Sequence, residues 1–212
     1  MTGTVLLFVV IAISVLPLIP AWFYFRKKNI KGVWFLICMG MGFISVIIAL
    51  LVQFYLPAFP ESSLSYIIYF FIRISLVEEL SRLVVFIPFF HYAARQKGID
   101  EDAELWGSKS GLIAGLGFAA AESVFYSASN VSIALLRAFS AAPLHGACGA
   151  RIGNALCCIR ERPLRSALLF LTAILIHGMY DFFIADPGLP SILSLFIAVA
   201  AFGSSLLSLR QN

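Results

Sequence analysis

The sequence predicts an all-α integral membrane protein, built as a bundle of about seven transmembrane helices. Of the 212 residues, 61% are hydrophobic and only 12% are charged, whereas a soluble domain is roughly 45–50% apolar and 25% charged. This abundance of large apolar residues also excludes a disordered chain. A helix that crosses the hydrocarbon core needs roughly 20 residues, so little chain is left for a soluble domain. We therefore expect one membrane-embedded domain over residues 1–212.

Seven apolar runs give the expected helices, each ended by a charged or turn residue. The first run has no basic segment before it and no small-residue cleavage site, so we expect a retained span. The breaks between runs are a basic loop at 26–31, a turn at 56–63, a hydrophilic segment at 94–109, Asn130, a basic loop at 160–165 and a turn at 185–189. The expected spans lie near residues 4–25, 33–56, 64–91, 109–129, 131–159, 166–184 and 189–209.

Lysine and arginine gather in alternate loops, which predicts the orientation of the bundle. They occur in the loops at 26–31, 95–109 and 160–165 and at Arg210, whereas the intervening loops contain none. Because basic loops stay in the cytoplasm, we expect an outside N-terminus and a cytoplasmic C-terminus. The formal net charge of +4 does not indicate a nucleic-acid partner, since the basic residues lie at helix ends rather than in one patch.

Four arginines fall within the expected spans. Arg137 and Arg151 lie toward opposite ends of the fifth span, where we expect their long side chains to reach the headgroups. Arg73 has no evident partner in the sequence. Arg82 follows Glu78 by one helical turn, so we expect these two side chains to pair.

Ionisable groups gather near the middle of four expected helices. Each costs about 2.5–3.5 kcal/mol at the bilayer centre even on a lenient scale, and replacing buried ions by apolar residues is often neutral or stabilising. A single such residue could equally be a packing residue with hydrogen bonds, but a set at one depth is typical of a functional site. The candidate catalytic residues are Glu78, Glu79, Glu122, His145 and His177.

Helical spacing indicates which residues support this set. Asp181 follows His177 by four residues, and Phe118 precedes Glu122 by four, so each pair shares a helix face. Small residues recur on the faces of Glu122 and His145, and such residues let helix backbones approach closely in lipid. We therefore expect the fourth and fifth spans to pack through these glycines, with the polar groups inside: Gly111, Gly115, Gly149 and Gly153.

The adjacent glutamates and Arg82 together provide a general base and an electrostatic clamp. Adjacent residues on a helix point about 100° apart, so we assign Glu78 to the Arg82 side and leave open which glutamate faces the reaction. A histidine can orient a water, donate to an oxyanion or bind a metal, and Asp181 could fix the tautomer of His177. This combination is typical of hydrolytic sites.

A metal site is an alternative use of the same residues. Glu122, His145 and His177 would form a three-ligand zinc site with one open position. The sequence has no His-Glu-x-x-His helix, so three separate helices would have to bring these ligands together.

Four segments carry the motifs in order: Glu78-Glu79-Leu-Ser-Arg82, Gly117-Phe118-Ala-Ala-Ala-Glu122, His145 followed by Gly149 and Gly153, and His177-Gly178-Met-Tyr-Asp181-Phe182. They resemble the successive motifs of the PrsW-type intramembrane proteases over about residues 64–184. More distantly they are similar to the CAAX prenyl protease and bacteriocin-processing (Abi) group. Two positions depart from the PrsW pattern: Arg82 stands where lysine is usual, and Ser123 where asparagine is common.

The resemblance implies that the glutamate pair activates water for peptide-bond hydrolysis, with the histidines assisting and the metal requirement open. It also implies a membrane-anchored protein substrate, such as an anti-sigma factor, in a bacterial plasma membrane. Two other functions remain as alternatives: an ion- or proton-coupled transporter, and a catalytically silent subunit that binds a partner helix. Transporters usually show inverted repeats, and we find none in this sequence.

Overall fold

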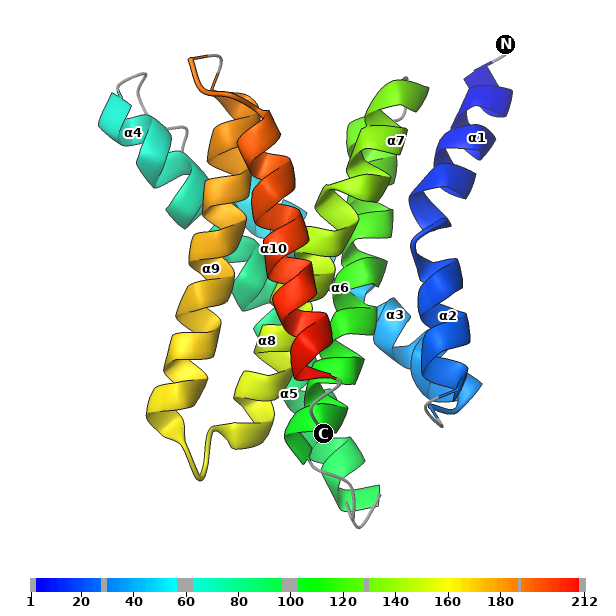
Figure 1. Cartoon of the computed structure of the whole chain (residues 1–212), viewed down its shortest axis with the longest axis vertical. Helices are drawn as coiled ribbons and strands as arrows, with labels where there is room; N and C mark the ends of the chain where they lie inside the picture. Colours follow the sequence, from blue (N-terminus) through cyan, green and yellow to red (C-terminus); the bar gives the residue numbers. More distant parts are fainter. Residues whose placement is uncertain are drawn as a thin grey trace.

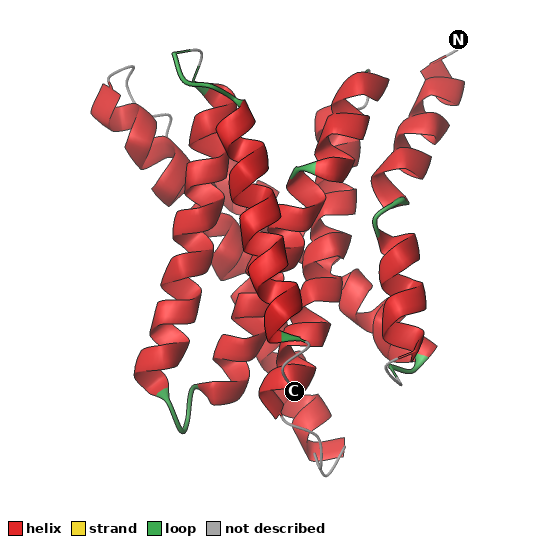
Figure 2. Cartoon of the chain, in the orientation of Figure 1, coloured by secondary structure: helices red, strands yellow, loops and turns green. Residues whose placement is uncertain are grey.

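The computed structural model describes residues 3–27, 30–56, 63–96, 103–127, 130–186 and 188–209. All regular elements in these ranges are helices, which confirms the predicted all-α class (Figure 2). They are α1 (Gly3–Val15), α2 (Leu18–Lys27), α3 (Gly32–Tyr55), α4 (Ser63–Ile68), the π-helix η1 (Tyr69–Leu76), α5 (Val77–Gln96), α6 (Ala103–Ser127), α7 (Val131–Phe139), α8 (Ala141–Cys158), α9 (Pro163–Ala185) and α10 (Ile192–Ser208).

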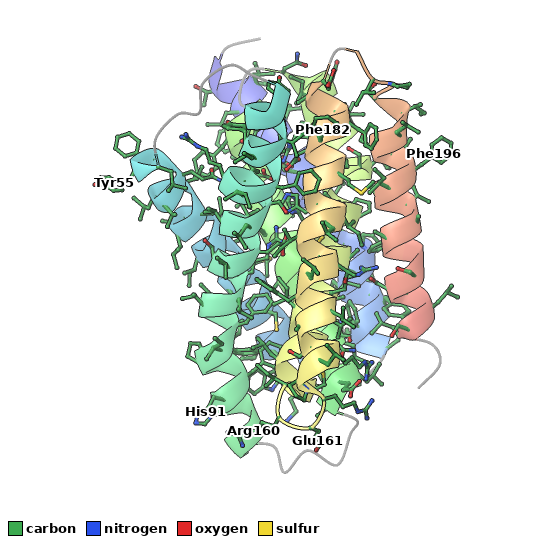
Figure 3. The ribbon with its side chains drawn as sticks, turned by 90° about the vertical axis from the view of Figure 1, so that its left-hand side faces the viewer. Tyr55, His91, Arg160, Glu161, Phe182 and Phe196 are labelled. Atoms are coloured by element: carbon green, nitrogen blue, oxygen red, sulfur yellow. The ribbon has the colours of Figure 1, made fainter. Side chains whose placement is uncertain are left out.

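Four helical stretches among the described residues are long and apolar enough to cross a membrane: Gly3–Lys27, Gly32–Tyr55, Val131–Cys158 and Pro163–Ala185. Helix α10 is apolar but shorter. Large apolar side chains such as Tyr55 and Phe196 project outward from the bundle, as lipid contact requires (Figure 3). The seven-span count, and the side of the membrane on which the N-terminus lies, remain predictions from the sequence.

Two of the expected spans are each divided into two helices. The first is broken between α1 and α2, where Pro17 and Pro20 lack the backbone N–H that a continuous helix would use. The fifth is broken at Ser140, between α7 and α8. Asn130 caps α7, because its side-chain oxygen accepts hydrogen bonds from the backbone N–H groups of Ser132 and Ile133 at 2.9 and 3.2 Å.

The boundary before α6 differs from the prediction. The sequence placed Lys109 in a cytoplasmic loop, but α6 begins at Ala103 and Lys109 is buried within it. The aromatic contacts of Trp106 explain the difference, since its ring stacks on Phe89 and meets Phe90 edge-on. These contacts draw the start of α6 into the bundle, and such packing between helices leaves no local signal in the sequence.

The helical stretches alternate in direction (Figure 1). The C-terminal ends of α2, α5 and α8 lie at one end of the molecule, and the start of α1 and the end of α9 lie at the other (Figure 1). His91, Arg160 and Glu161 mark the first of these ends (Figure 3). Alternation therefore brings basic segments to one end, although the loop positions Lys28, Pro60 and Asp102 lie outside the described residues.

Helix α6 lies at the centre, buried along most of its length between α8 and α3. Its approach to α8 depends on glycines: a Cβ at Gly111 would lie 2.1 Å from the Gly149 carbonyl oxygen, and one at Gly115 would lie 2.0 Å from that of His145. The expected packing through small residues is thus confirmed. It sets α6 and α8 at backbone contact beside the candidate site.

Candidate active site

The structure brings all of the sequence-predicted site residues together, on four helices. The glutamate pair and Arg82 lie at the start of α5, directly after the π-helix, and the other residues come from α6, α8 and α9. All are buried except Asp181, whose side chain is 20% exposed. The set comprises Glu78, Glu79, Arg82, Phe118, Glu122, His145, His177 and Asp181.

Arg82 makes its hydrogen bonds to Glu79 and a longer ion pair with the expected Glu78. Its Nη1 atom lies 2.5 and 2.6 Å from the two carboxylate oxygens of Glu79, whereas its Nη2 atom is 3.8 Å from Oε2 of Glu78. Residues three and four positions apart lie on the same helix face. Spacing allowed both pairs, and the structure has both: the expected ion pair with Glu78 is present but long, and the hydrogen bonds go to Glu79.

His177 is oriented by Glu79. Its Nδ1 atom lies 2.7 Å from Oε1 of Glu79, and because a carboxylate only accepts, we assign the proton to Nδ1. Its Nε2 lies near two further carboxylates, at 3.2 Å from Oδ2 of Asp181 and 3.6 Å from Oε2 of Glu78. Neither of these oxygens has a hydrogen-bond partner in the described part of the chain. Asp181 thus lies beside His177 as the spacing predicted, and Glu79 holds the other ring nitrogen.

His145 has the same arrangement with other partners. Nη2 of Arg82 donates to its Nδ1 at 2.7 Å, since a guanidinium has no acceptor. Its Nε2 therefore carries the proton and donates to Oε2 of Glu122 at 2.8 Å. Each histidine thus has a carboxylate behind one ring nitrogen and a lone pair on the other.

The Phe118 ring packs against both the Arg82 guanidinium and the His145 ring. The Cζ atom of Arg82 lies 4.0 Å from the centre of the Phe118 ring, a distance at which the ring attracts a cation. The same ring lies 5.0 Å from that of His145. Phe118 thus holds Arg82 and His145 in place without a polar contact of its own.

Arg137 belongs to the site, and our expectation that it reaches the headgroups was wrong. Its Nη2 atom lies 2.5 Å from Oε2 of Glu122, its Nε donates to Oγ of Ser123 at 3.2 Å, and its Cζ lies 4.8 Å from the Tyr126 ring centre. Helix α7 packs on α6, which brings the arginine to the carboxylate. The available signal was the buried Glu122, because a buried charge needs an opposite charge.

Gln53 is a site residue that sequence reasoning missed. Its side-chain Nε2 donates to Oε1 of Glu78 at 3.3 Å, and its backbone oxygen accepts from Arg73 at 3.0 Å. The second contact gives Arg73 the partner that the sequence did not reveal. The signal was a polar amide within the otherwise apolar run of α3.

Three of these side chains could hold a metal ion. One ligand atom each from Glu78, His145 and His177 lies within 4.8 Å of the others, and all three residues are buried. The sequence suggested Glu122 in place of Glu78. In the structure Glu122 lies behind His145, where it accepts the Nε2 proton.

Comparison with known proteins gives one finding. A family model described as the PrsW family intramembrane metalloprotease matches residues 28–205, most of the chain. Neither the curated proteins nor the solved structures give a match. The chain therefore belongs to the PrsW family, as the motifs indicated, and it is a multi-pass membrane protease. Its partners include the lipid bilayer and a membrane-protein substrate, and nothing favours a transporter or a silent subunit.

Proposed function

We propose that this PrsW family protease hydrolyses a peptide bond of a membrane-anchored protein at the site formed by α5, α6, α8 and α9. The observation that carries the proposal is the buried cluster of Glu78, His145 and His177, whose ligand atoms lie within 4.8 Å of one another, together with a Glu78 oxygen that has no hydrogen-bond partner among the described residues. The proposed substrate is an anti-sigma factor or a similar regulator, in a bacterial plasma membrane.

The residues present fit a divalent ion of the zinc type. Histidine nitrogens and a carboxylate oxygen are the usual ligands of catalytic zinc, and a carboxylate behind each imidazole is the usual support. In this proposal Glu78, His145 and His177 would hold the ion, while Glu79 and Glu122 fix the two tautomers. When bound, the ion would act as a Lewis acid on the scissile carbonyl and on water.

Glu78 is the glutamate of the pair that faces the reaction in this proposal, either as a ligand of the ion or as the base that acts on water. Glu79 accepts hydrogen bonds from Arg82 and from His177, so its oxygens are occupied. Within the described part of the chain, Glu78 receives one long hydrogen bond, from Gln53 to Oε1. Its Oε2 accepts none there and has only longer ion pairs with His177 and Arg82, at 3.6 and 3.8 Å. That oxygen can take a proton from water or bind the ion. Replacing Glu78 should remove the metal if Glu78 is a ligand and leave it bound if Glu78 is the base.

Arg82 and Glu122 act through other residues and are positioning residues. Arg82 lies against Glu79 on one side and His145 on the other. Glu122 holds the Nε2 proton of His145. Together they fix the ring of His145, as Glu79 fixes that of His177, so the geometry is set before a substrate enters.

The test is to express the wild type and a Glu78→Gln variant in the same membranes and compare which membrane proteins are cleaved. Loss of a general base lowers the rate by about 10²–10⁴-fold. The matched control is Glu161→Gln, an exposed glutamate at the far end of the molecule (Figure 3), which should cleave normally. Metal content of the purified variant then separates the roles, since loss of metal indicates a ligand and retention indicates a base. Wild-type cleavage by a folded Glu78→Gln protein would overturn the proposal.

A further inference from the structure

A second polar pocket lies on α8 beyond the candidate active site. Arg151 follows His145 by six residues, which is about 9 Å along the helix axis. The pocket has a volume of about 170 Å³ and is formed by α6, α8, α9 and α10. Its lining is rich in serine: Ser108, Ala150, Arg151, Asn154, Leu169, Ser204, Ser205 and Ser208.

The charge of Arg151 meets only neutral acceptors. Its Nη1 donates to the backbone oxygen of Ala147 at 2.9 Å and to Oγ of Ser205 at 3.0 Å, and its Nη2 donates to Oγ of Ser204 at 2.8 Å. The arginines of the site, the fully buried Arg82 and the mostly buried Arg137, differ because carboxylates balance them. No carboxylate forms an ion pair with Arg151 in the described ranges. An uncompensated cation in a membrane protein is costly, so the pocket favours an anion.

Asn154 lies on the same face of α8 as Arg151 and has a buried hydrogen-bond acceptor without a donor in the described part of the chain. It follows Arg151 by three residues, and its Nδ2 donates to Oγ of Ser108 at 3.1 Å. Its Oδ1 is buried and has no hydrogen-bond partner in the described part of the chain. A buried acceptor without a donor costs free energy. The pocket thus offers a cation for an anionic group and, beside it, an acceptor for a hydrogen-bond donor.

The pocket lies toward the end of the bundle where basic segments gather. Helix α8 ends at Cys158, and the exposed Arg160 and Glu161 that follow mark this end (Figure 3). Ser204 and Ser208 are exposed near the end of α10, so the pocket opens on the outer surface of the bundle. Basic pockets between membrane helices at such a depth are reached by phospholipid headgroups.

We propose that this pocket binds the phosphodiester headgroup of a phospholipid. The phosphate lies against Arg151, which supplies the positive charge. Ser204 and Ser205 hold the guanidinium in place but do not neutralise it. The ammonium of an ethanolamine headgroup, or a hydroxyl of a glycerol headgroup, donates to Oδ1 of Asn154. A phospholipid therefore satisfies both requirements at once, whereas a water satisfies only the second.

The experiment measures which lipids remain bound to the purified protein in detergent, by native mass spectrometry. The probes are phosphatidylethanolamine, phosphatidylglycerol and phosphatidylcholine, the last of which has the phosphate but no headgroup donor. We expect the first two to be retained several-fold better than the third. Arg151→Gln should lower retention of all three about tenfold, because it removes a charge-assisted hydrogen bond. The matched control Arg160→Gln, which removes an exposed arginine, should retain them as the wild type does.

Further variants and inorganic phosphate complete the test. Asn154→Leu should abolish the preference over phosphatidylcholine while leaving retention of that lipid unchanged. Arg151→Lys keeps the charge but not the forked pair of N–H donors of the guanidinium, so its lipid retention should lie between those of Arg151→Gln and the wild type. If Arg151→Gln does not fold, Arg151→Lys is the variant to measure.

Two results would overturn the proposal. An Arg151-dependent rise in melting temperature with inorganic phosphate equal to that with phospholipid would identify free phosphate as the ligand instead. Wild-type lipid retention by folded Arg151→Gln or Arg151→Lys would mean that the serines alone satisfy this residue. Neither readout depends on protease activity, so the proposal is tested independently of the proposed function.

Discussion

The Arg137 guanidinium lies 2.5 Å from Oε2 of Glu122, although 15 residues separate them in the chain. The same oxygen accepts the Nε2 proton of His145 at 2.8 Å. Arg137 therefore acts on the site through Glu122, at one end of a continuous chain of polar contacts. That chain runs through Arg137, Glu122, His145, Arg82, Glu79 and His177.

Arg137→Gln should destabilise the protein by about 3–5 kcal/mol, because removing one partner leaves a buried charge uncompensated. Cleavage should fall as well, since Glu122 would no longer be held against His145. Thermal unfolding in detergent measures the first effect. The double variant Arg137→Gln/Glu122→Gln removes both charges and should recover stability but not cleavage. A single variant as stable as the wild type would show that the pair is not buried in the folded protein.

Glu79→Gln should be less stable than Glu78→Gln. Both oxygens of Glu79 accept from Arg82 or His177, so glutamine removes the charge that balances the buried guanidinium and places an NH2 donor where one of these acceptors was. Glu78→Gln should lose cleavage with a smaller loss of stability, because its Oε2 has no hydrogen-bond partner among the described residues. Melting temperature and cleavage measured on the same preparations separate the two variants. The opposite order of stability would contradict this assignment of partners.

Arg82→Lys should bind a divalent metal ion about tenfold more tightly than the wild type. An ion held by Glu78, His145 and His177 needs the lone pair on Nδ1 of His145, which now accepts from Arg82 at 2.7 Å. Lysine keeps the positive charge beside Glu79 but lacks the second arm of the guanidinium. Absorption titrations with Co²⁺ in detergent measure the affinity directly. Equal affinity in both proteins would mean that Arg82 does not compete with the ion, and a chelator that leaves cleavage intact would exclude the ion from the reaction.

Gly115→Leu should disrupt the bundle, since even a Cβ there would lie 2.0 Å from the His145 carbonyl oxygen. Helices α6 and α8 would have to separate, at a cost of about 3 kcal/mol or more. Gly203→Leu is the matched control, because a Cβ at Gly203 has no atom within 4 Å. Thermal unfolding of both variants checks the difference. Equal stability of the two would argue against backbone contact between α6 and α8.

Reporter fusions should place Lys28, Asp102 and Arg162 in the cytoplasm and Pro60 and Asp186 outside, as the positive-inside rule requires. The opposite-facing ends of successive helices in Figure 1 fit this alternation. Both termini on the same side would contradict the expected odd number of spans.

The sequence predicted eight residues that the structure brings together, and the helices that carry them. Intramembrane charges are costly enough that each of them stands out from an apolar background. It also predicted the glycine contact between α6 and α8, since small residues at four-residue spacing form a recognisable stripe. It missed Gln53, whose contact with Glu78 joins two helices and follows no spacing rule.

The sequence by itself determined the helical class, the membrane setting and the set of ionisable residues, because these follow from composition and from periodicity within one helix. Only the tertiary structure decided how those residues pair. Arg82 has its hydrogen bonds with Glu79 and only a longer ion pair with Glu78, and Arg137 holds Glu122. Helix spacing gives a residue's face but not the neighbour that meets it, whereas a charge in a bundle interior is stabilised by whichever partner packing brings within hydrogen-bond distance.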